Sequence, residues 1–580
     1  MRFLSAACML AVMTVVIAGP ATAQTYKTLD FIGTGNASFS DPNNWVEITN
    51  INDVATWPGE PLGTHHVPDA NVEVVYIRNG ANVSVSSGTF LTCIKSGASS
   101  SLHVGHDPIY DPNYIGVPGT FKYLSMPAST LNISGTATIL IDPNDAYNND
   151  CITAGVFYNG TINQSGGYIQ ADHLRIGEGV GATGKYNLSG GTANLTYGRM
   201  TVGYASGKMD ANAVPNAIVG GSYGEVTMSG GLVQLNGAGA GLQIGLYRTS
   251  ITSGYTDGNG ANYISLAAGT GKMTVSDGVL RCTNPGTAAN MNLGYGVGYV
   301  NPQDPNGGLY QAKGTFIQTG GSVGFDNEVR VGYEGGDGYL EVTGGSFIAR
   351  RLRVGSTSTA VPQGALSTGT IRIGPGAYFE IGKRGGTYAW AQFYSPSQAS
   401  AVKLICDVTP AGAGKLNTVG QAVLDPNNFT LDLNAISFRP KQGDKYTVID
   451  ANSAGNTPTQ ITSNITVGQD PNYSTMFTAA YNGGDLEATF RGFTAGDCGG
   501  DGTVGLLDLG KLGANWNKTG QAWADGDFSG DGVVGLLDLG ALAANWNWTK
   551  PAGAPVPVPE PATMALLGLG GLALIRRKRS

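Results

Sequence analysis

Apolar and polar residues alternate along most of the chain, in short runs that end at glycine. In the segment Leu174 to Gly177, the apolar residues Leu174 and Ile176 flank the polar Arg175. Successive side chains of a β-strand point to opposite faces, so the two apolar residues share one face and the arginine lies on the other. The pattern predicts β-strands with one buried face, separated by glycine turns.

Two short motifs recur in the middle of the chain in a fixed order. The first ends in Ser/Thr-Gly-Gly or a close variant, and the second reads apolar-x-apolar-Gly. The hydroxyl residue of the first motif is Ser165, Ser189, Ser229, Ser276, Thr319 and Thr343. The second motif ends at Gly177, Gly203, Gly245, Gly294, Gly332 and Gly355. Repetition in a fixed order indicates stacked units, with inserts where the spacing is longer.

We therefore expect an all-β fold, with a parallel β-helix (β-solenoid) in residues 131–385 and one coil per repeat of the shortest spacing, as from Ser165 to Ser189. Such coils bury apolar surface only by stacking, and corner glycines permit the positive φ of sharp bends. Residues 24–130 are interpreted as an N-terminal β region and cap. Residues 386–492, where the motifs fade, are interpreted as an antiparallel β domain or a C-terminal cap. A string of β-sandwiches is the alternative, but sandwich strands show no such repeat order.

The repeats resemble the autotransporter-passenger-like β-helical repeats of large bacterial surface proteins. The stretch FSDPNNWV, at residues 39–46, is similar to the segment that precedes such solenoids. The resemblance implies a rod-like extracellular body. It leaves the handedness of the coil open.

Composition supports strands over helices and narrows the choice of partners. Glycine accounts for 90 of 580 residues, charged residues for 13% and hydrophobic residues for 41%. Much glycine and few charges argue against long helices, and the hydrophobic content argues against disorder. The formal net charge of −8 makes nucleic acid an unfavourable partner. Five cysteines lie beyond the N-terminal segment 1–23, and their wide spacing favours isolated buried thiols over a disulfide framework.

Both ends of the chain read as targeting segments. Residues 1–23 contain a basic start, an apolar stretch and an Ala-Thr-Ala cleavage site, the pattern of a secretory signal peptide. Residues 551–580 contain a Pro-rich linker, the motif Val558-Pro559-Glu560-Pro561, the apolar segment 562–575 and an Arg-rich end. These parts, in this order, resemble the PEP-CTERM sorting signal.

The sorting-signal resemblance implies a route to the cell surface. It predicts a secreted protein that is anchored transiently in the membrane by its C-terminus, cleaved by an exosortase-type enzyme, and delivered to the cell surface or outer membrane of a bacterium with an outer membrane. A lasting transmembrane anchor is the alternative. The apolar segment 562–575 is shorter than the ~20 residues that a spanning helix needs.

The most specific chemistry lies in two copies of an acidic loop, which begin at Gly496 and Gly526. In a calcium loop, positions 1, 3, 5 and 12 supply side-chain oxygens, position 7 a carbonyl oxygen and position 6 a glycine turn. The predicted Ca²⁺ ligands are Asp497, Asp501, Thr503 (carbonyl) and Asp508, and then Asp527, Ser529, Asp531, Val533 (carbonyl) and Asp538. Gly499 replaces one side-chain ligand in the first loop, so we expect that loop to bind more weakly. A pair of Asp/Gly turns without metal is the alternative.

A helix is expected after each loop, because leucines recur there at helical spacing. Two loop–helix units in residues 496–548 resemble a type I-like dockerin domain, which implies docking on a cohesin-like protein or a surface assembly. The partner-contact positions of that family fall on Leu506, Leu507, Leu536 and Leu537. Hydroxyl residues are often found at these positions, so the leucines weaken the expectation of an ordinary cohesin partner.

A β-helix can also carry a polysaccharide lyase or hydrolase site. The residues to weigh are His103, His106 and Asp107 as metal ligands, Arg350, Arg351 and Arg353 as contacts for an acidic sugar, and Tyr295, Tyr299, Tyr333 and Tyr339 as rings that stack on sugars. Solvated loop histidines, solvated arginines and ordinary strand tyrosines are the plainer interpretations. No carboxylate cluster or catalytic motif stands out, so no catalytic residue is assigned.

The sequence thus favours a secreted structural or adhesive surface protein with a calcium-dependent docking module. An exopolysaccharide is a further expected partner. The alternative is an extracellular carbohydrate-active enzyme, a lyase or hydrolase, that is delivered by a dockerin.

Overall fold

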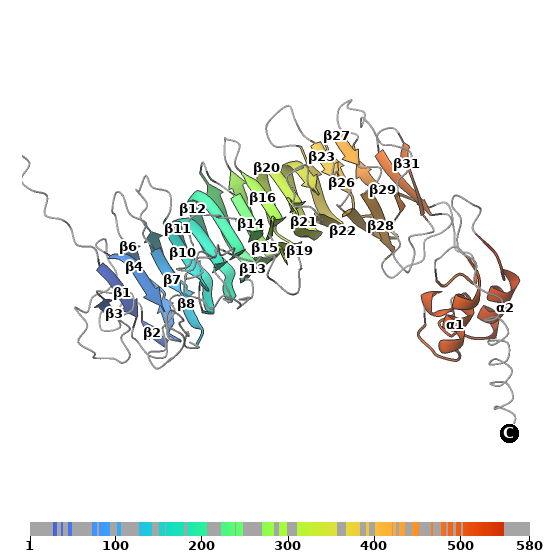
Figure 1. Cartoon of the computed structure of the whole chain (residues 1–580), viewed down its shortest axis with the longest axis horizontal. Helices are drawn as coiled ribbons and strands as arrows, with labels where there is room; N and C mark the ends of the chain where they lie inside the picture. Colours follow the sequence, from blue (N-terminus) through green and yellow to red (C-terminus); the bar gives the residue numbers. More distant parts are fainter. Residues whose placement is uncertain are drawn as a thin grey trace, which may run out of the picture.

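The chain is mostly β-strand in the computed structural model, which confirms the predicted all-β class. Figure 1 shows an elongated body of strands that run across its long axis, and two short helices after its C-terminal end. The structure describes residues 27–31, 36–38, 45–48, 72–77, 80–92, 101–105, 127–141, 150–156, 158–178, 183–205, 222–237, 239, 241–247, 269–283, 289–298, 310–355, 367–382, 390–393, 401–419, 421–424, 429–435, 444–451, 466–467, 477–482, 485–490, 495–499, 503–521, 523–529 and 531–549.

The strands of the N-terminal half are β1 (Lys27–Phe31), β2 (Asn36–Ser38), β3 (Trp45–Ile48), β4 (Val72–Ile77), β5 (Asn82–Val85), β6 (Thr89–Thr92), β7 (Ser101–Val104), β8 (Ser129–Ile133), β9 (Thr138–Ile141), β10 (Cys151–Ala154), β11 (Gly160–Glu178), β12 (Thr183–Ala205), β13 (Tyr223–Asn236), β14 (Gly241–Tyr247), β15 (Thr270–Thr283) and β16 (Asn290–Tyr295).

The remaining elements are β17 (Val297–Gly298), β18 (Tyr310–Gln311), β19 (Lys313–Gln318), β20 (Ser322–Tyr333), β21 (Asp337–Val354), β22 (Thr368–Ile381), β23 (Trp390–Phe393), β24 (Ala401–Thr409), β25 (Gly412–Ala413), β26 (Leu416–Thr418), β27 (Gln421–Leu424), β28 (Phe429–Ala435), β29 (Lys445–Asp450), β30 (Thr466–Val467), β31 (Phe477–Asn482), β32 (Asp485–Phe490), α1 (Leu506–Ala514), the 3₁₀ turn η3 (Trp523–Asp525) and α2 (Leu536–Ala544).

Parallel pairing joins the strands of the body into three stacks. The first stack runs β2, β5, β8, β11, β12, β13, β15, β19, β21, β22, β24, β28 and β30. The second runs β6, β9, β11, β12, β13, β15, β20, β21, β22, β26 and β29. The third runs β1, β4, β7, β10, β11, β12, β14, β16, β20, β21, β23 and β27.

The longest strands take part in all three stacks, because they turn at the repeat motifs. In β11, residues 160–164 lie in the first stack, residues 168–171 in the second and residues 173–176 in the third. The Ser-Gly-Gly motif lies at the first turn. Each pass of the chain therefore contributes one layer to every stack.

The register aligns equivalent residues of the repeat from layer to layer. Leu174 lies beside Met200, Met200 beside Leu242, and Leu242 beside Met291. All four side chains are fully buried, and each such burial stabilises the fold by about 1.5–3 kcal/mol. In the later layers aromatic rings fill the same interior, where Phe347 stacks on Phe379 with ring centroids 4.9 Å apart.

The corner glycines have the backbone conformation that the sequence predicts. The last glycine of both motifs has positive φ in all six units. At Gly191, for example, φ is 83°, and the carbonyl carbon of Gly166 lies 2.5 Å from where a Cβ would stand. The layers approach too closely at these turns for any side chain, which explains why glycine recurs there.

Asparagine side chains form a ladder on the outer face of the first stack. Asn132 donates to Asn82 Oδ1 at 2.7 Å, Asn163 to Asn132 Oδ1 at 2.9 Å, and Asn187 to Asn163 Oδ1 at 2.8 Å. Each amide bonds the one in the preceding layer, so the ladder stabilises stacking directly, by about 1 kcal/mol per hydrogen bond.

Antiparallel pairing occurs at the two ends of the body and also joins β17 to β18 in the middle of the chain. β1 pairs with β3 at the N-terminal end, and β32 pairs with β29 and β31 at the C-terminal end. Within residues 386–492 the parallel stacks continue as far as β27, β29 and β30, and β25 pairs with β24 in a short antiparallel turn. Hairpins at both ends limit the length of unpaired strand edge that a parallel stack exposes.

The four cysteines in the described residues are buried and unbridged: Cys151, Cys282, Cys406 and Cys498. Cys93 lies outside the described residues. Burial raises the pKa of all four thiols, and that of Cys282 to about 12. The isolated buried thiols expected from the sequence are thus seen at these four positions.

We predict that these four thiols resist an aromatic disulfide reagent at pH 8 in the folded protein and react fully in urea. Folding raises the pKa values of these thiols. Their contribution to the free energy of unfolding is therefore fully present below the unfolded thiol pKa of about 8.5, and it is lost as the pH rises towards the pKa values of the folded protein. Thiol titration with and without urea measures this. Equal rates in both states would contradict it.

In the part of the chain that the structure describes, no helix combines the length and the apolar character needed to cross a bilayer. The signal segment 1–23 and the C-terminal segment 551–580 lie outside the described residues.

Candidate functional site

The two predicted loops each lead directly into a helix. α1 begins after Gly505 and α2 after Gly535, and an aspartate follows in the first turn of each. The N–H of Gly505 donates to Asp508 Oδ2 at 2.9 Å, and the N–H of Gly535 donates to Asp538 Oδ2 at 2.7 Å. The carboxylates thus bond N–H groups that have no partner within the helix.

The other oxygen of each helix aspartate closes its loop. Gly499 N–H donates to Asp508 Oδ1 at 2.8 Å, and Ser529 N–H donates to Asp538 Oδ1 at 2.7 Å. Burial acts to raise the pKa of Asp538, but the N–H groups of Gly535 and Ser529 outweigh it and hold the pKa below its ordinary value of 3.8. The loop therefore favours the charged carboxylate.

The second loop brings most of its predicted ligands into one hydrogen-bonded turn. Asp527 Oδ2 accepts the N–H of Gly532 at 2.9 Å, and the Ser529 hydroxyl donates to Asp527 Oδ1 at 3.2 Å. Asp531, which is exposed, accepts the N–H of Val533 at 2.9 Å. The donor set consists of carboxylate, hydroxyl and carbonyl oxygens, which suit a hard cation such as Ca²⁺.

The first loop is described only in part. Asp497 and Asp508 are buried, Thr503 is half-buried, and Asp501 lies outside the described residues. Cys498 Sγ lies 3.4 Å from Asp508 Oδ1, in the place that Phe528 takes in the second loop. Over the residues the structure describes, no three Asp, Glu, His or Cys side chains form a metal cluster. Calcium binding therefore stays a prediction.

The two loop–helix units pair with each other in equivalent ways. Thr503 bridges to Thr549, and Val533 bridges to Thr519, each in antiparallel fashion. The side-chain amide of Asn515 donates to the Asp525 carbonyl at 3.0 Å, as that of Asn545 does to the Ala495 carbonyl at 2.7 Å. The same contacts occur once in each direction between the two units, so each unit completes the other.

Three leucines of the predicted partner surface are exposed. Leu507, Leu536 and Leu537 are 72%, 77% and 70% exposed, whereas Leu506 is half-buried. Leu512 and Leu542 of the same helices are buried between the units with Trp523 and Phe528. The helices therefore divide their leucines between an interior face and an open face.

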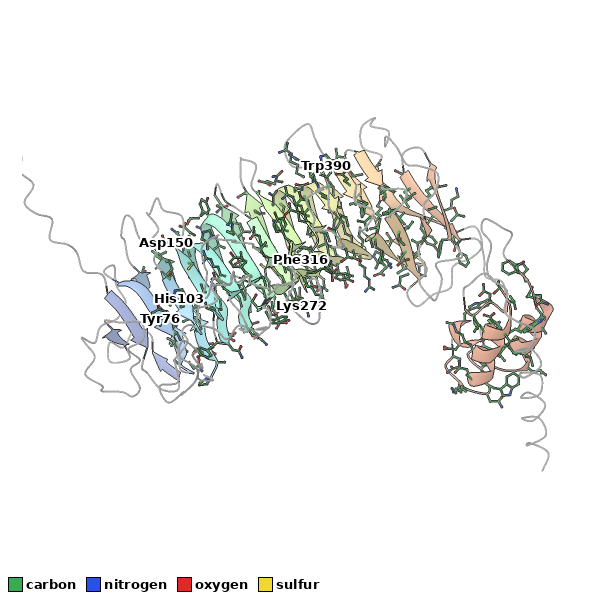
Figure 2. All side chains as sticks on the ribbon, in the orientation of Figure 1. Tyr76, His103, Asp150, Lys272, Phe316 and Trp390 are labelled. Atoms are coloured by element: carbon green, nitrogen blue, oxygen red, sulfur yellow. The ribbon has the colours of Figure 1, made fainter. Side chains whose placement is uncertain are left out.

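Of the three candidate metal ligands His103, His106 and Asp107, the described residues include His103 alone. The His103 ring stacks on Tyr76 at 5.4 Å, and its Nδ1 lies 2.7 Å from the Thr153 hydroxyl oxygen. Figure 2 shows Tyr76 and His103 close to each other on the body. His106 and Asp107 lie outside the described residues. The contacts of His103 are those of a packed strand residue.

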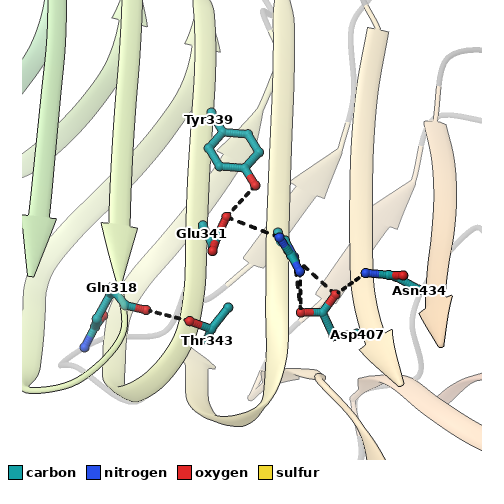
Figure 3. A network of polar contacts seen from close by, with 7 residues as sticks. Gln318, Tyr339, Glu341, Thr343, Asp407 and Asn434 are labelled. Carbon is teal, nitrogen blue, oxygen red and sulfur yellow. Dashed lines mark hydrogen bonds and ion pairs between the residues drawn. The ribbon is translucent and has the colours of Figure 1, made fainter. Parts of the chain in front are cut away.

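A polar network that the sequence did not reveal crosses the first stack (Figure 3). Arg372 Nη1 lies 3.7 Å from Glu341 Oε2, and Arg372 Nη2 lies 3.1 Å from Asp407 Oδ2. Tyr339 donates to Glu341 at 2.6 Å, and Asn434 donates to Asp407 at 3.1 Å. Burial and the hydrogen bond to Glu341 raise the pKa of the Tyr339 hydroxyl to about 12.

This network joins two carboxylates that the sequence does not place near each other. Glu341 and Asp407 are far apart in the sequence, and only the stacking of β21, β22 and β24 brings them to either side of Arg372. Both carboxylates interact with this guanidinium, which compensates their burial. The arrangement is suited first to holding three layers together.

A second cluster lies on the third stack and combines arginines with aromatic rings. Arg330 Cζ lies 4.9 Å from the centroid of the Tyr333 ring, and Arg353 Cζ lies 5.0 Å from that of Trp390. Glu328, which is buried, lies 2.7 Å from Arg330 Nη2 and 2.9 Å from Arg353 Nε. Sequence reasoning singled out Arg353 and Tyr333 but missed Glu328 and Trp390, because neither stands in a repeated motif.

Residues 557–579 match the PEP-CTERM protein-sorting motif, which confirms that part of the sequence analysis. The motif indicates export to the cell envelope by a C-terminal sorting signal and processing by an exosortase. Comparison with curated proteins and with solved structures finds no match.

Proposed function

We propose that the chain is a structural or adhesive surface protein with a parallel β-solenoid body and a dockerin-like calcium module in residues 496–548. The observation that carries the proposal is the register of the repeats, in which Leu174, Met200, Leu242 and Met291 follow one another through adjacent layers. A body built this way extends by adding layers, and each layer presents three rows of outward side chains. Long repetitive faces suit adhesion and spacing more than turnover.

The module would hold Ca²⁺ through the oxygens of its two loops. Asp527, Ser529, Asp531, Asp538 and the Val533 carbonyl would bind one ion, and Asp497, Asp501, Asp508 and the Thr503 carbonyl the other. When bound, the cation would neutralise the buried carboxylates of the loops. Support comes from the oxygen-only donor set and from the backbone N–H groups that keep Asp538 ionised.

The module's open face would dock the protein to a partner. Leu507, Leu536 and Leu537 offer an apolar surface, which fits a cohesin-like protein or a surface assembly with an apolar contact face. Because the chain also carries the sorting motif, we place the mature protein at the cell surface or outer membrane in this proposal, after transient anchoring by its C-terminus. An exopolysaccharide is the proposed ligand of the body.

A second candidate is a carbohydrate-active enzyme, a lyase or hydrolase. The observation that favours it is the Glu341, Arg372 and Asp407 network, since glycoside hydrolysis uses a pair of carboxylates. Release of reducing sugar from a polysaccharide panel, abolished in Asp407→Asn, would support the enzyme. A panel without turnover would leave the structural role as the better account.

We predict two unequal calcium sites in the full mature chain. Gly499 withholds a side-chain oxygen from the first loop, so Gly499→Asp should tighten the weaker site about tenfold or more, because a carboxylate adds a charged ligand. Gly499 has no positive φ, so the backbone accepts the aspartate. Titration calorimetry with Ca²⁺ measures both sites. Asp531→Asn, at an exposed ligand, should weaken only the other site; an absence of binding in the wild-type chain would refute the calcium module.

A further inference from the structure

The arginine–aromatic strip of the third stack has features that layer stacking alone does not require. We define the strip as Tyr295, Glu328, Arg330, Tyr333, Arg351, Arg353 and Trp390, from strands β16, β20, β21 and β23. These strands are consecutive layers of the third stack. Trp390 lies at the edge of the body in Figure 2.

Aromatic rings and guanidiniums contact one another along the strip. Tyr295 stacks on Tyr333 with centroids 5.5 Å apart and planes inclined by 17°. Arg353 Cζ lies 5.8 Å from the Tyr333 centroid and 5.0 Å from that of Trp390. Cation–π contacts of this kind fix the guanidinium planes before any ligand arrives. The strip is therefore a rigid surface rather than a set of mobile arginines.

Glu328 holds the arginines from below. Its side chain is only 4% exposed, while those of Arg330 and Arg353 are 25% and 18% exposed. The Nε and Nη2 atoms of Arg330 both lie 2.7 Å from Glu328 Oε2. A guanidinium carries five N–H donors, so Arg330 keeps donors beyond those of Nε and Nη2 that face Glu328.

Two polar atoms beside this pair lack a hydrogen-bond partner among the residues that the structure describes. The Oδ1 of Asn292, in register with Arg330, and the Nε of Arg351, in register with Glu328, are both without one. Asn292 is buried although it points to the outer side of its strand. A buried acceptor or donor without a hydrogen bond costs free energy, unless a ligand supplies the missing bond.

A backbone outlier adjoins the strip. Glu334 follows Tyr333 and has φ of 51°, one of three non-glycine residues with positive φ in the described chain. Its carboxylate accepts a hydrogen bond from the Tyr295 hydroxyl. Burial, and then this hydrogen bond, raise the pKa of Tyr295 to about 12. Strained backbone of this kind gathers at ligand sites. The strain supports a site here, because glycine would have relieved it.

The charge and spacing of the strip indicate the ligand. Arg330, Arg351 and Arg353 against Glu328 and Glu334 leave a net charge of +1 on a chain of net charge −8. Layers about 4.8 Å apart repeat at nearly the spacing of sugars in an extended 1,4-linked chain. Fixed guanidiniums bind carboxylates, and aromatic edges and faces pack on sugar rings. A nucleic acid carries a charge every ~1.7 Å, which is far closer than arginines in layers about 4.8 Å apart can match.

We propose that the strip binds an extended acidic polysaccharide, a chain of uronic acid residues whose carboxylates contact Arg330 and Arg351 and whose hydroxyls bond Asn292. This inference rests on the adhesive role proposed above and names its ligand. It does not depend on the calcium module, so the calcium titration and the binding test below can fail separately.

The test is binding of the full mature chain to polygalacturonate, measured by affinity electrophoresis and calorimetry. We expect binding in the wild-type chain and a tenfold or greater loss in Arg330→Gln and in Arg351→Gln. Arg281→Gln is the matched control, since Arg281 is an exposed arginine of β15 on the second stack. Thermal melts of all three variants establish that the body stays folded.

The alternatives give different results. Absence of polyuronate binding would overturn the proposal, as would an equal loss in Arg281→Gln. In another outcome, a neutral glucan binds as tightly as polygalacturonate and keeps that affinity in Arg351→Gln. That result would show that the arginines do not select for acidic sugars and would overturn the proposal. Equal binding of heparin or DNA, lost in the same variants, would show general polyanion binding and overturn the assignment to uronic acids.

Discussion

Gly245→Ala is expected to destabilise the layers around β14 and β19 by about 2–5 kcal/mol. Gly245 has φ of 66°, and an added Cβ would stand 1.9 Å from the carbonyl oxygen of Lys313, the first residue of β19. That carbonyl belongs to the backbone of a stacked strand and cannot move aside as a side chain would. The left-handed conformation alone accounts for about 1–2 kcal/mol of the loss.

The effect should be local, because each layer contacts only its neighbours. Hydrogen exchange of residues 241–247 and 313–318 measures it. Gly376→Ala is the matched control: it lies in the same body, its φ is not positive, and its nearest contact is the Thr343 carbonyl oxygen at 3.3 Å. We expect that variant to change stability by less than about 1 kcal/mol. Similar exchange in both variants would contradict the close approach of the layers.

Asp538→Ala is expected to unfold residues 496–548 and to leave the body intact. Asp538 is fully buried and accepts hydrogen bonds from the N–H groups of Ser529 and Gly535. Its loss leaves both N–H groups without an acceptor, which lowers the free energy of unfolding by about 1–3 kcal/mol for each. Four of the 7 tryptophans lie in this module, at Trp516, Trp523, Trp546 and Trp548, so fluorescence reports its unfolding. Folding lowers the pKa of the Asp538 carboxyl, so the stability that the ionised carboxylate contributes should be lost as the pH falls below about 4.

Asp531→Asn serves as the control for this change. Asp531 is exposed, and an asparagine can still accept the N–H of Val533 through its amide oxygen. The module should therefore stay folded without calcium in this variant. A native fluorescence spectrum in Asp538→Ala would show that the buried carboxylate does not hold the loop and helix together.

The repeated parts of the fold could be predicted from the sequence, because each rests on local chemistry. Leu174 and Ile176 alternate with Arg175, and the first two are buried while Arg175 is half-buried. Gly177 ends the motif and has φ of 70°. Alternation fixes the face of a strand, and glycine marks the turn, without reference to distant residues.

The contacts between distant layers could not be predicted in the same way. Glu328 lies beside Arg353 because the turn between β20 and β21 sets the register of the two strands. Arg372 lies beside Asp407 in a part of the chain where the repeat motifs have faded. Inserts of varying length hide the register, and one residue of slip would place each side chain on the opposite face. Both polar clusters of the body depend on that register.

The two acidic loops of residues 496–548 lie between these two cases. Their spacing predicts the helices and the place of Asp508 and Asp538, and the structure places both at the first turn of a helix. The sequence does not show that Thr503 pairs with Thr549 or Val533 with Thr519. That exchange between the units follows from packing of Leu512 and Leu542 in a shared interior.

Pyrene labels on paired cysteines test the stacked body most directly. Thr227 and Thr274 are far apart in the sequence, yet they lie side by side on β13 and β15 in the first stack. The double variant Thr227→Cys with Thr274→Cys should give strong excimer fluorescence, because adjoining strands are about 4.8 Å apart. Thr227→Cys with Thr430→Cys, on the distant strand β28, should give only monomer emission. Monomer emission from both pairs would contradict the stacked register on which the account depends.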